Sequence, residues 1–375
     1  MSDPGPGTPS PPAGRRIFLV GYYGVDNLGD EAIRHAIETA AASLGVEVAR
    51  FASRGRSTDP RAVPTGLRAI PATIRAIRAT DRVVLGGGGI LKDEGLRLPV
   101  ELFVTAVLAR LARRRVDLLA VGVGPFYRPV GRWLVAAIAR LCRVRTVRDE
   151  ASAIALRGLG VGRVLVGADP IFAGDGPAPV VPTGSDRVSG RSRRAAVSVR
   201  PWFDRHPPAG GGADPVARLQ TDLATGLGPL RRAGWAIDFL ALYWPRDRDA
   251  GRAVAARLPD GSGEVVEAAA ALDWASLGTA IAASDLVIAM RYHAVAAAAL
   301  AGRPVIAIAY EPKVASLAAD LAIPAVAVDD PALAANLGSV VATAVEGRTL
   351  PVADPDAVAA LRERAWTALR AVLLG

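Results

Sequence analysis

Short runs of Val, Ile and Leu alternate with longer amphipathic stretches along almost the whole of this chain. The runs are continuously apolar, which is typical of strands buried on both faces of a parallel sheet. Helices between such strands then cover the two faces, so the pattern predicts an α/β fold. Strands are expected within residues 16–24, 46–53, 81–89, 116–125, 144–150, 163–170, 195–202, 235–244, 263–268, 284–293, 303–310 and 325–330.

Residues 174–194 interrupt this alternation with a stretch rich in Pro, Gly, Ser and charge. Because 375 residues are enough for two domains, we interpret the stretch as a linker. Open parallel sheets bind ligands beyond the carboxyl ends of their strands, so we expect an active site in the cleft between the domains. The expected organisation is a disordered tail at 1–15, a Rossmann-like domain at 16–173, the linker at 174–194, a second Rossmann-like domain at 195–345 and C-terminal helices at 346–375.

Composition excludes several classes of protein. The single cysteine, Cys142, cannot form an internal disulfide and fits a reducing compartment; it lies in an apolar run where we expect a packed thiol. No run of 18 uncharged apolar residues occurs, so no transmembrane segment is expected. Residues 1–15 lack the apolar core of a secretory signal, so we expect a cytoplasmic protein.

The formal net charge of +9 suits an anionic substrate and also contact with an acidic membrane surface. Arginines are spread along the chain, aromatic residues make up only 5%, and no nucleic-acid-binding motif occurs, so nucleic acid is not an expected partner. His35 and His206 have no ligand-like neighbours in the sequence, and we expect neither a metal nor a cofactor. His206 lies in the Gly- and Pro-rich loop 203–215, which we interpret as a lid.

The stretch GYYGVDNLGDEAI, residues 21–33, follows directly on the first predicted strand and ends at a predicted helix start. Asp30 and Glu31 fall in or next to the first turn of that helix. Acidic residues are favoured there because they cap the helix and complement its dipole, so a structural role for Asp30 competes with a catalytic one. The glycines of this loop lack the G-x-G-x-x-G spacing, which disfavours binding of NAD.

Four consecutive glycines, residues 86–89, follow the third predicted strand. Such a run lets a ligand approach backbone N–H groups closely, which makes Gly87 and Gly88 candidate substrate-binding residues. A packing turn between strand and helix accounts for the run equally well. Lys92, six residues beyond Gly86, is expected to be solvated.

Two arginines end predicted strands in matching places. Arg148 ends the fifth strand, and Arg200 follows the first strand of the second domain. A guanidinium at a carboxyl strand end can fork onto a carboxylate or a phosphate of a substrate. For Arg148 an ion pair with Asp149 or Glu150 is the alternative, and for Arg200 the alternative is an ordinary surface position.

The stretch MRYHAVAAAALAGRPVIAIAYEPKV, residues 290–314, holds the strongest candidates. Arg291 and His293 are two residues apart at a strand end, so both side chains leave the same face if the chain stays extended. Lys313 follows the next strand and is one of only 2 lysines beside 43 arginines. We expect the three side chains to converge beside a helix N-terminus. They suit a substrate with a phosphate and a carboxylate, and His293 can exchange protons near neutral pH.

These stretches, in this order, resemble the sequence blocks of the polysaccharide pyruvyltransferase family. GYYGVDNLGDEAI is similar to its N-terminal signature, which ends in GDE. The later blocks are VVLGGGGILKDE, TVRDEAS, GADPIF and the stretch 290–314, so that the resemblance spans Gly21 to Val314. It implies a fold like that of the two-domain GT-B glycosyltransferases. It also implies transfer of the pyruvyl group of phosphoenolpyruvate to a sugar, with formation of a pyruvate ketal and release of phosphate.

The resemblance implies an active-site set of Asp30, Arg148, Arg291, His293 and Lys313. The basic side chains would hold and neutralise the carboxylate and the phosphate of the donor. His293 would supply a proton to the methylene carbon or to the departing phosphate, and Asp30 would be the general base for a sugar hydroxyl; the two proton roles can be exchanged. The expected acceptor is a sugar of a cell-surface polysaccharide or of its precursor, including a lipid-linked one.

Two positions depart from the residues that are frequent in the family. Residues 25–28 read Val-Asp-Asn-Leu where aromatic or small residues are frequent, and Gly89 stands where Ser is frequent. Neither change removes a charged group, so activity is still expected and only acceptor contacts are affected.

Two other functions compete with this interpretation. A GT-B glycosyltransferase that uses a nucleotide sugar would need an acidic residue late in the second domain, for which Glu311 is the candidate. A non-catalytic carbohydrate-binding protein would keep the fold without the reactive side chains. Retention of Asp30, Arg291 and His293 disfavours the non-catalytic alternative.

Overall fold

The computed structural model describes residues 16–176, 192–203, 214–348 and 352–375. Contacts along the chain divide it into two compact units. The first unit comprises Met1–Val25, Asp30–Gly174 and Arg362–Gly375, and the second comprises Asp26–Gly29 and Asp175–Leu361. The expected tail at 1–15, most of the expected linker at 174–194, and His206 with most of its loop lie outside the described residues.

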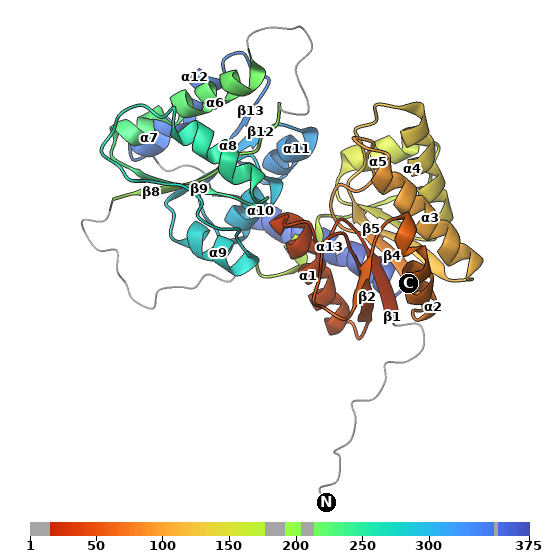
Figure 1. Ribbon diagram of the computed structural model, residues 1–375. Helices are drawn as coiled ribbons and strands as arrows, with labels where there is room; N and C mark the ends of the chain where they lie inside the picture. Colours follow the sequence, from red (N-terminus) through yellow and green to blue (C-terminus); the bar gives the residue numbers. More distant parts are fainter. Residues whose placement is uncertain (1–15, 177–191, 204–213, 349–351) are drawn as a thin grey trace, which may run out of the picture. The chain divides into compact units, whose positions relative to one another are not determined.

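The first unit is built on a sheet of seven parallel strands (Figure 1), whose order is β3-β2-β1-β4-β5-β6-β7. The strands are β1 (Arg16–Val20), β2 (Glu47–Ser53), β3 (Ala62–Pro64), β4 (Arg82–Gly86), β5 (Arg115–Val121), β6 (Arg145–Val147) and β7 (Leu165–Val166). Every strand except β3 lies in or within one residue of a predicted stretch. The edge strand β3 escaped prediction because it is three residues long and ends in proline, which is disfavoured in strands.

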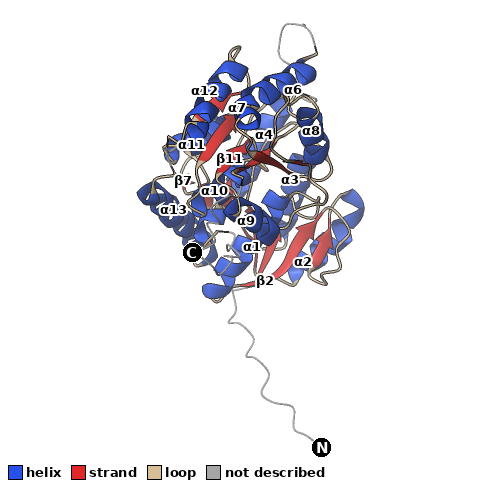
Figure 2. Ribbon diagram, turned by 90° about the vertical axis from the view of Figure 1, so that its left-hand side faces the viewer, coloured by secondary structure: helices blue, strands red, loops and turns tan. Residues whose placement is uncertain are grey.

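Helices cover both faces of this sheet (Figures 1 and 2). Side chains of α2, α3, α4 and α5 form one core cluster with the strands, and side chains of α1 and α13 form another. The elements are α1 (Leu28–Ser43), the 3₁₀ turn η1 (Leu67–Ala69), α2 (Ile70–Arg78), α3 (Arg97–Leu111), α4 (Pro129–Leu141), α5 (Glu150–Gly158), the 3₁₀ turn η2 (Pro170–Ala173) and α13 (Pro355–Leu373). Double-sided burial explains the continuous apolar runs, since β4 is buried along its whole length.

The second unit has a sheet of six parallel strands in the order β10-β9-β8-β11-β12-β13. The strands are β8 (Arg194–Ser198), β9 (Ala236–Leu240), β10 (Val265–Val266), β11 (Leu286–Ala289), β12 (Val305–Ala309) and β13 (Ala325–Ala327). All six lie in or within one residue of predicted stretches. The prediction of two Rossmann-like domains with parallel sheets is confirmed.

The helices of the second unit also lie on both faces of its sheet. Side chains of α6, α7, α8 and α12 form the core on one face, and α10 and α11 pack against β11 and β12. The helices are α6 (Pro215–Gly226), α7 (Gly228–Arg232), α8 (Arg246–Ala255), α9 (Trp274–Ala282), α10 (Tyr292–Leu300), α11 (Pro312–Asp320) and α12 (Leu333–Val345). The last helix, α13, has residues in both units.

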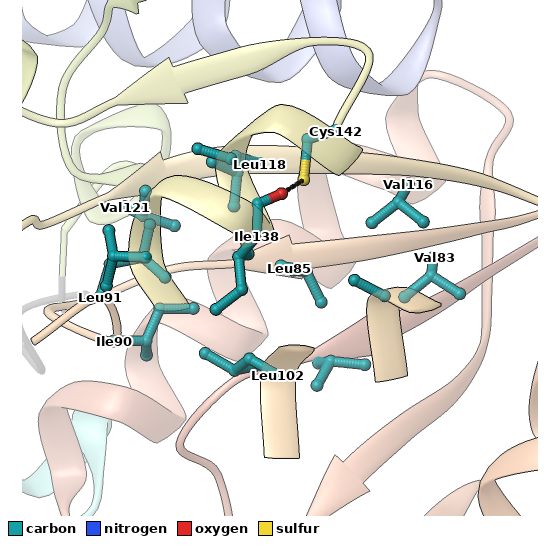
Figure 3. Packing of buried hydrophobic residues seen from close by; sticks show 14 of the residues in the cluster. Val83, Leu85, Ile90, Leu91, Leu102, Val116, Leu118, Val121, Ile138 and Cys142 are labelled. Atoms are coloured by element: carbon teal, nitrogen blue, oxygen red, sulfur yellow. Dashed lines mark hydrogen bonds between the residues drawn. The ribbon is translucent and has the colours of Figure 1, made fainter. Parts of the chain in front are cut away.

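Figure 3 shows the core of the first unit around Cys142. The thiol is buried and its Sγ lies 3.2 Å from the carbonyl oxygen of Ile138, with Leu118 and Val116 nearby. Burial raises the pKa of this thiol, which keeps it in the unreactive neutral form. The prediction of a packed thiol is confirmed.

Each sheet has one point at which the strand order reverses. It falls between β1 and β4 in the first unit and between β8 and β11 in the second. Loops that leave such neighbouring strands diverge to opposite faces, which opens a crevice where α/β proteins bind ligands. Within the described residues, no helix is long and apolar enough to cross a bilayer.

Candidate functional site

Asp30 and the glycine run meet at the reversal point of the first unit. Asp30 is in the first turn of α1, which follows β1, and Gly87 and Gly88 follow β4. Both glycines have left-handed backbones, with φ of +75° and +71°, which side-chain-bearing residues rarely adopt. A Cβ atom at Gly88 would lie 3.0 Å from Oδ1 of Asp30, so this carboxylate lies directly against the glycine backbone.

A buried tyrosine that the sequence analysis missed supports this loop from below. The hydroxyl of Tyr23 donates a 2.7 Å hydrogen bond to the carbonyl oxygen of Gly86. Burial, together with the negative charges of Asp30 and Glu31, raises the pKa of Tyr23 well above its usual value. Tyr23 therefore stays a neutral donor and fixes the end of β4.

Arg148 is buried beside the same loops. Its Nε lies 3.1 Å from Oδ2 of Asp149, which confirms the ion pair that the sequence offered as an alternative. Its Nη1 lies 3.8 Å from Oδ2 of Asp169. A Cβ atom at Gly122, the residue after β5, would lie 2.7 Å from Nη2, so the guanidinium occupies the space that glycine leaves open.

Asp169 is a titratable group that sequence reasoning did not single out. Its side chain is fully buried and accepts a 3.2 Å hydrogen bond from the backbone N–H of Ile171. Burial raises the pKa of Asp169 to about 6, although the positive charge of Arg148 opposes the shift. The available signals were its place just after the short run that became β7 and its position in the block GADPIF.

In the second unit, cationic side chains that follow β8 and β12, the strands on either side of β11, meet around Tyr310. Nη1 of Arg200, which follows β8, donates a 2.7 Å hydrogen bond to the hydroxyl of Tyr310 and lies 3.8 Å from Oε1 of Glu311. Lys313, in the first turn of α11, forms an ion pair with Glu311, and its Nζ lies 5.3 Å from the Tyr310 ring centroid. Trp202 packs against the same ring at 4.8 Å between centroids.

The pKa of Tyr310 reflects the charges that surround it in this cluster. Burial raises the pKa of its hydroxyl, but the positive charges of Lys313, Arg200 and Arg291 together outweigh burial and the nearby Glu311. The net effect is a pKa below the usual value. Three cations that follow β8, β11 and β12 therefore act on the half-buried side chain of Tyr310.

Arg291 is held by a carboxylate from another helix. Its Nε lies 2.8 Å from Oδ2 of Asp247, and its Nη2 pairs with Oδ1 of the same side chain. Asp247, in the first turn of α8, is fully buried and also accepts a 2.9 Å hydrogen bond from the backbone N–H of Tyr243. The fork of Arg291, expected on a substrate, is therefore occupied by Asp247.

The chain does not stay extended through His293. Strand β11 ends at Ala289, Arg291 is the N-cap residue, and α10 begins at Tyr292, because an alanine-rich run with high helix propensity follows. Arg291 and His293 therefore do not leave one face of a strand. A Cβ atom at Gly29 would overlap the imidazole of His293, so glycine is required at that position.

Other candidates have structural roles. Lys92 pairs with Glu94 at 2.7 Å rather than being simply solvated. The carboxylate of Asp93 accepts hydrogen bonds from the backbone N–H groups of Tyr127 and Arg128, just ahead of α4. Among the described residues, His35 is exposed on α1 and no group of three or more His, Cys, Asp or Glu residues is arranged to hold a metal.

A separate small pocket lies between the sheet of the first unit and α2 and α3. Its lining is mostly apolar, and it also includes the ion pair of Arg54 with Glu101. Neither Asp30 nor Arg148 lines it.

Two parallel-sheet α/β units, with charged side chains gathered at the carboxyl ends of their strands, define a GT-B-like protein. Solved structures with this fold agree. The UDP-GlcNAc 2-epimerase of Methanocaldococcus jannaschii has a TM-score of 0.58 at 10% identity and covers 96% of this chain and 99% of its own. That of Neisseria meningitidis, solved with UDP-GlcNAc, has a TM-score of 0.53 at 10% identity over 96% and 100%. A glycosyltransferase of Rickettsia africae has a TM-score of 0.56 at 10% identity over 95% and 93%.

At these identities the solved structures establish the fold alone, whereas the sequence itself establishes the family. Residues 27–312 match the family model of the polysaccharide pyruvyl transferases, which is most of the chain. The chain belongs to this family. No individual curated protein matches the sequence.

Proposed function

We propose that this protein transfers the pyruvyl group of phosphoenolpyruvate to two hydroxyls of a sugar, which yields a pyruvate ketal and inorganic phosphate. The observation that carries the proposal is that Arg200 donates a hydrogen bond to Tyr310 and Lys313 lies 5.3 Å from the centroid of its ring, while the positive charge of Arg291 acts on the same side chain. Phosphoenolpyruvate bears a phosphate and a carboxylate on a three-carbon skeleton. A compact cluster of cations is the chemistry that such a ligand requires.

Arg200 and Lys313 are the proposed contacts to the donor. In the structure both lie near the carboxylate of Glu311, which stands where a donor oxygen would provide the same charge. We propose that, when the donor binds, the ammonium group of Lys313 leaves Glu311 and pairs with the phosphate or the carboxylate of the donor. Arg291 is held in place by Asp247. We propose that it attracts the donor through its positive charge and does not form a two-pronged hydrogen-bonded contact with it.

The proposed chemistry needs one acid and one base. A proton from His293 adds to the methylene carbon of the donor while a sugar hydroxyl attacks the neighbouring carbon and gives its proton to Asp30. The carbon–oxygen bond to phosphate then breaks, and a second hydroxyl of the same sugar closes the ketal, its proton leaving with the phosphate. The roles of His293 and Asp30 can be exchanged without changing this balance.

The first unit is proposed to serve the acceptor. Asp30 lies against Gly88, and the N–H groups of Gly87 and Gly88 are proposed donors to a sugar oxygen or an anionic intermediate. Buried Arg148, paired with Asp149, is proposed to bind substrate from beside this loop or to fix its position. The acceptor is proposed to be a cell-surface polysaccharide or its precursor, and the reaction to take place in the cytoplasm, where the donor is made. No cofactor takes part in the proposed steps.

Calorimetric titration with phosphoenolpyruvate tests the donor site directly and needs no acceptor. We expect Arg200→Ala and Lys313→Ala each to weaken binding by about 10- to 100-fold, since each removes a charge-assisted hydrogen bond. Arg194→Ala is the matched control for the first, because Arg194 starts the strand that Arg200 follows. Lys92→Ala, at the other lysine, is the control for the second.

Binding that survives both substitutions, or that the two controls weaken equally, would contradict the proposal. Absence of donor binding by the wild type together with binding of UDP-GlcNAc would favour a nucleotide-sugar glycosyltransferase, a function that the fold shared with the Rickettsia enzyme supports. A carbohydrate-binding protein without activity would bind sugar and neither donor.

A further inference from the structure

The outer face of α3 and α4 in the first unit exposes large apolar side chains. Leu111 is 75% exposed, Tyr127 and Trp133 are each 58% exposed, and Val130 is 46% exposed. Phe103 of α3 packs on Trp133 of α4 with ring centroids 5.6 Å apart, which joins the two helices into one surface. We call this surface, defined by these five residues, the α3–α4 face. Figure 1 shows the two helices.

Helix α3 carries apolar residues on more than one side, beside the charged Arg97, Glu101 and Arg110. Its inner side carries the buried residues of the sheet core. Val100, Phe103, Val107 and Leu111 recur at helical spacing on another side, where each is at least partly exposed. An apolar stripe of this length indicates a partner that removes it from water.

The surroundings of the α3–α4 face are basic. Residues 95–114 and 126–148 contain a single acidic residue, Glu101, which pairs with Arg54 and Arg97. The same segments contain seven exposed arginines, namely Arg97, Arg110, Arg113, Arg128, Arg132, Arg140 and Arg143. A partner of this surface must therefore be apolar at its centre and anionic around it.

We propose that the α3–α4 face docks on the surface of a bilayer that contains anionic phospholipids. Trp and Tyr side chains prefer the boundary between headgroups and acyl chains, and arginines bind lipid phosphates around them. A second copy of this chain fits poorly, because a two-fold interface would set the arginines against their own counterparts. The proposal does not depend on the identity of the donor or the acceptor.

Co-sedimentation of the full chain with lipid vesicles tests the proposal. The wild type should bind vesicles with about 30% phosphatidylglycerol in phosphatidylcholine, bind pure phosphatidylcholine much less, and lose binding as salt is raised. Each arginine near an anionic surface is worth roughly fivefold in binding, so Arg110→Gln/Arg132→Gln should weaken it about 30-fold. The control Arg257→Gln/Arg348→Gln removes the same charge from exposed positions of the second unit and should weaken it far less.

Trp133→Ser tests the apolar part of the contact, and Ile154→Ser on α5, where Ile154 is 62% exposed, is its control. We expect Trp133→Ser to weaken vesicle binding at least tenfold and Ile154→Ser to leave it unchanged. Equal binding to both kinds of vesicle, or equal loss in variants and controls, would overturn the proposal. So would a dimer of the wild type that Trp133→Ser converts to a monomer, since the face would then belong to a second copy.

Discussion

The ion pair of Asp247 with Arg291 allows a direct test of how much a buried carboxylate that holds a cation contributes to stability. The substitution Asp247→Asn keeps the shape of the side chain and removes its charge. The carboxylate now accepts from two nitrogens of Arg291 and from the backbone N–H of Tyr243. An amide offers one oxygen, so its NH₂ group must face at least one of these donors.

The expected cost follows from burial of the pair. Asp247 is fully buried and the side chain of Arg291 is 12% exposed, so the substitution removes a carboxylate that pairs with a largely buried guanidinium. Removal of one partner from a buried ion pair typically costs about 3–5 kcal/mol. We expect the free energy of unfolding to fall by about that amount in urea titrations followed by circular dichroism. Phosphoenolpyruvate binding should also weaken, because the direction of Arg291 is lost.

The neighbouring acid on the same helix is the control. Asp249 is 59% exposed and pairs with Arg248, so Asp249→Asn should change stability by less than about 1 kcal/mol. The double variant Asp247→Leu/Arg291→Met should recover most of the stability that Asp247→Asn loses, because no charge is then left buried. It should not recover the donor binding that Asp247→Asn loses, because Arg291 is absent. Equal unfolding midpoints for Asp247→Asn and Asp249→Asn would refute the reasoning, since the buried pair would then contribute no more than an exposed one.

Two further predictions concern the first unit. Burial raises the pKa of Asp169 to about 6 from an ordinary 3.8, so the ionised carboxylate disfavours the folded state. The stability that the protonated carboxyl provides is therefore full below about pH 4 and is lost as the pH rises through about 6. The free energy of unfolding of Asp169→Asn, relative to that of the wild type, should therefore rise by about 2 kcal/mol as the pH is raised from about 4.5 to about 7.5 in urea titrations. Parallel dependence of the two proteins on pH would contradict this. Gly87→Ala meets both a left-handed φ and an overlap with Ile33, so we expect a loss of about 2 kcal/mol or more. Gly95→Ala, which meets nothing within 4 Å, should cost less than about 1 kcal/mol, and equal melting temperatures of the two variants would show that the loop relaxes freely.

The sequence predicted the fold well because the fold follows from local pattern. Continuous apolar runs separated by helical stretches located twelve of the thirteen strands, and only β3 was too short to carry the pattern. The helix start at Tyr292 was placed too late, because the apolar Met290 and the strand-favouring Tyr292 prolong the apparent strand past Ala289, where β11 ends.

The partners of the candidate site residues were much harder to predict. Asp247 lies 44 residues before Arg291 in a charged stretch that reads as an ordinary solvated helix start. Asp169 reads as a turn residue before proline, and its raised pKa depends on burial that no local pattern records. Arg200 and Lys313 follow β8 and β12, the strands on either side of β11, and both reach Tyr310. The sequence analysis grouped Lys313 only with Arg291 and His293, because the order of the strands in the sheet is not written in the local pattern. The substrate-binding roles of Arg200 and Lys313 stay predictions.

Helix α13 has a consequence for how the chain is made. Its residues from Arg362 onward pack on β1, β4 and β5 of the first unit, where Ala368, Leu369 and Val372 complete the core on the α1 side. During synthesis those strands leave the ribosome long before α13, and residues 175–361 of the second unit are translated between them and the end of α13. The first unit therefore begins to leave the ribosome first but is completed last, and until α13 has been translated one face of its sheet lacks part of its packing. Premature termination near the C-terminus would damage the N-terminal half of the protein and leave the sheet that holds the cation cluster intact.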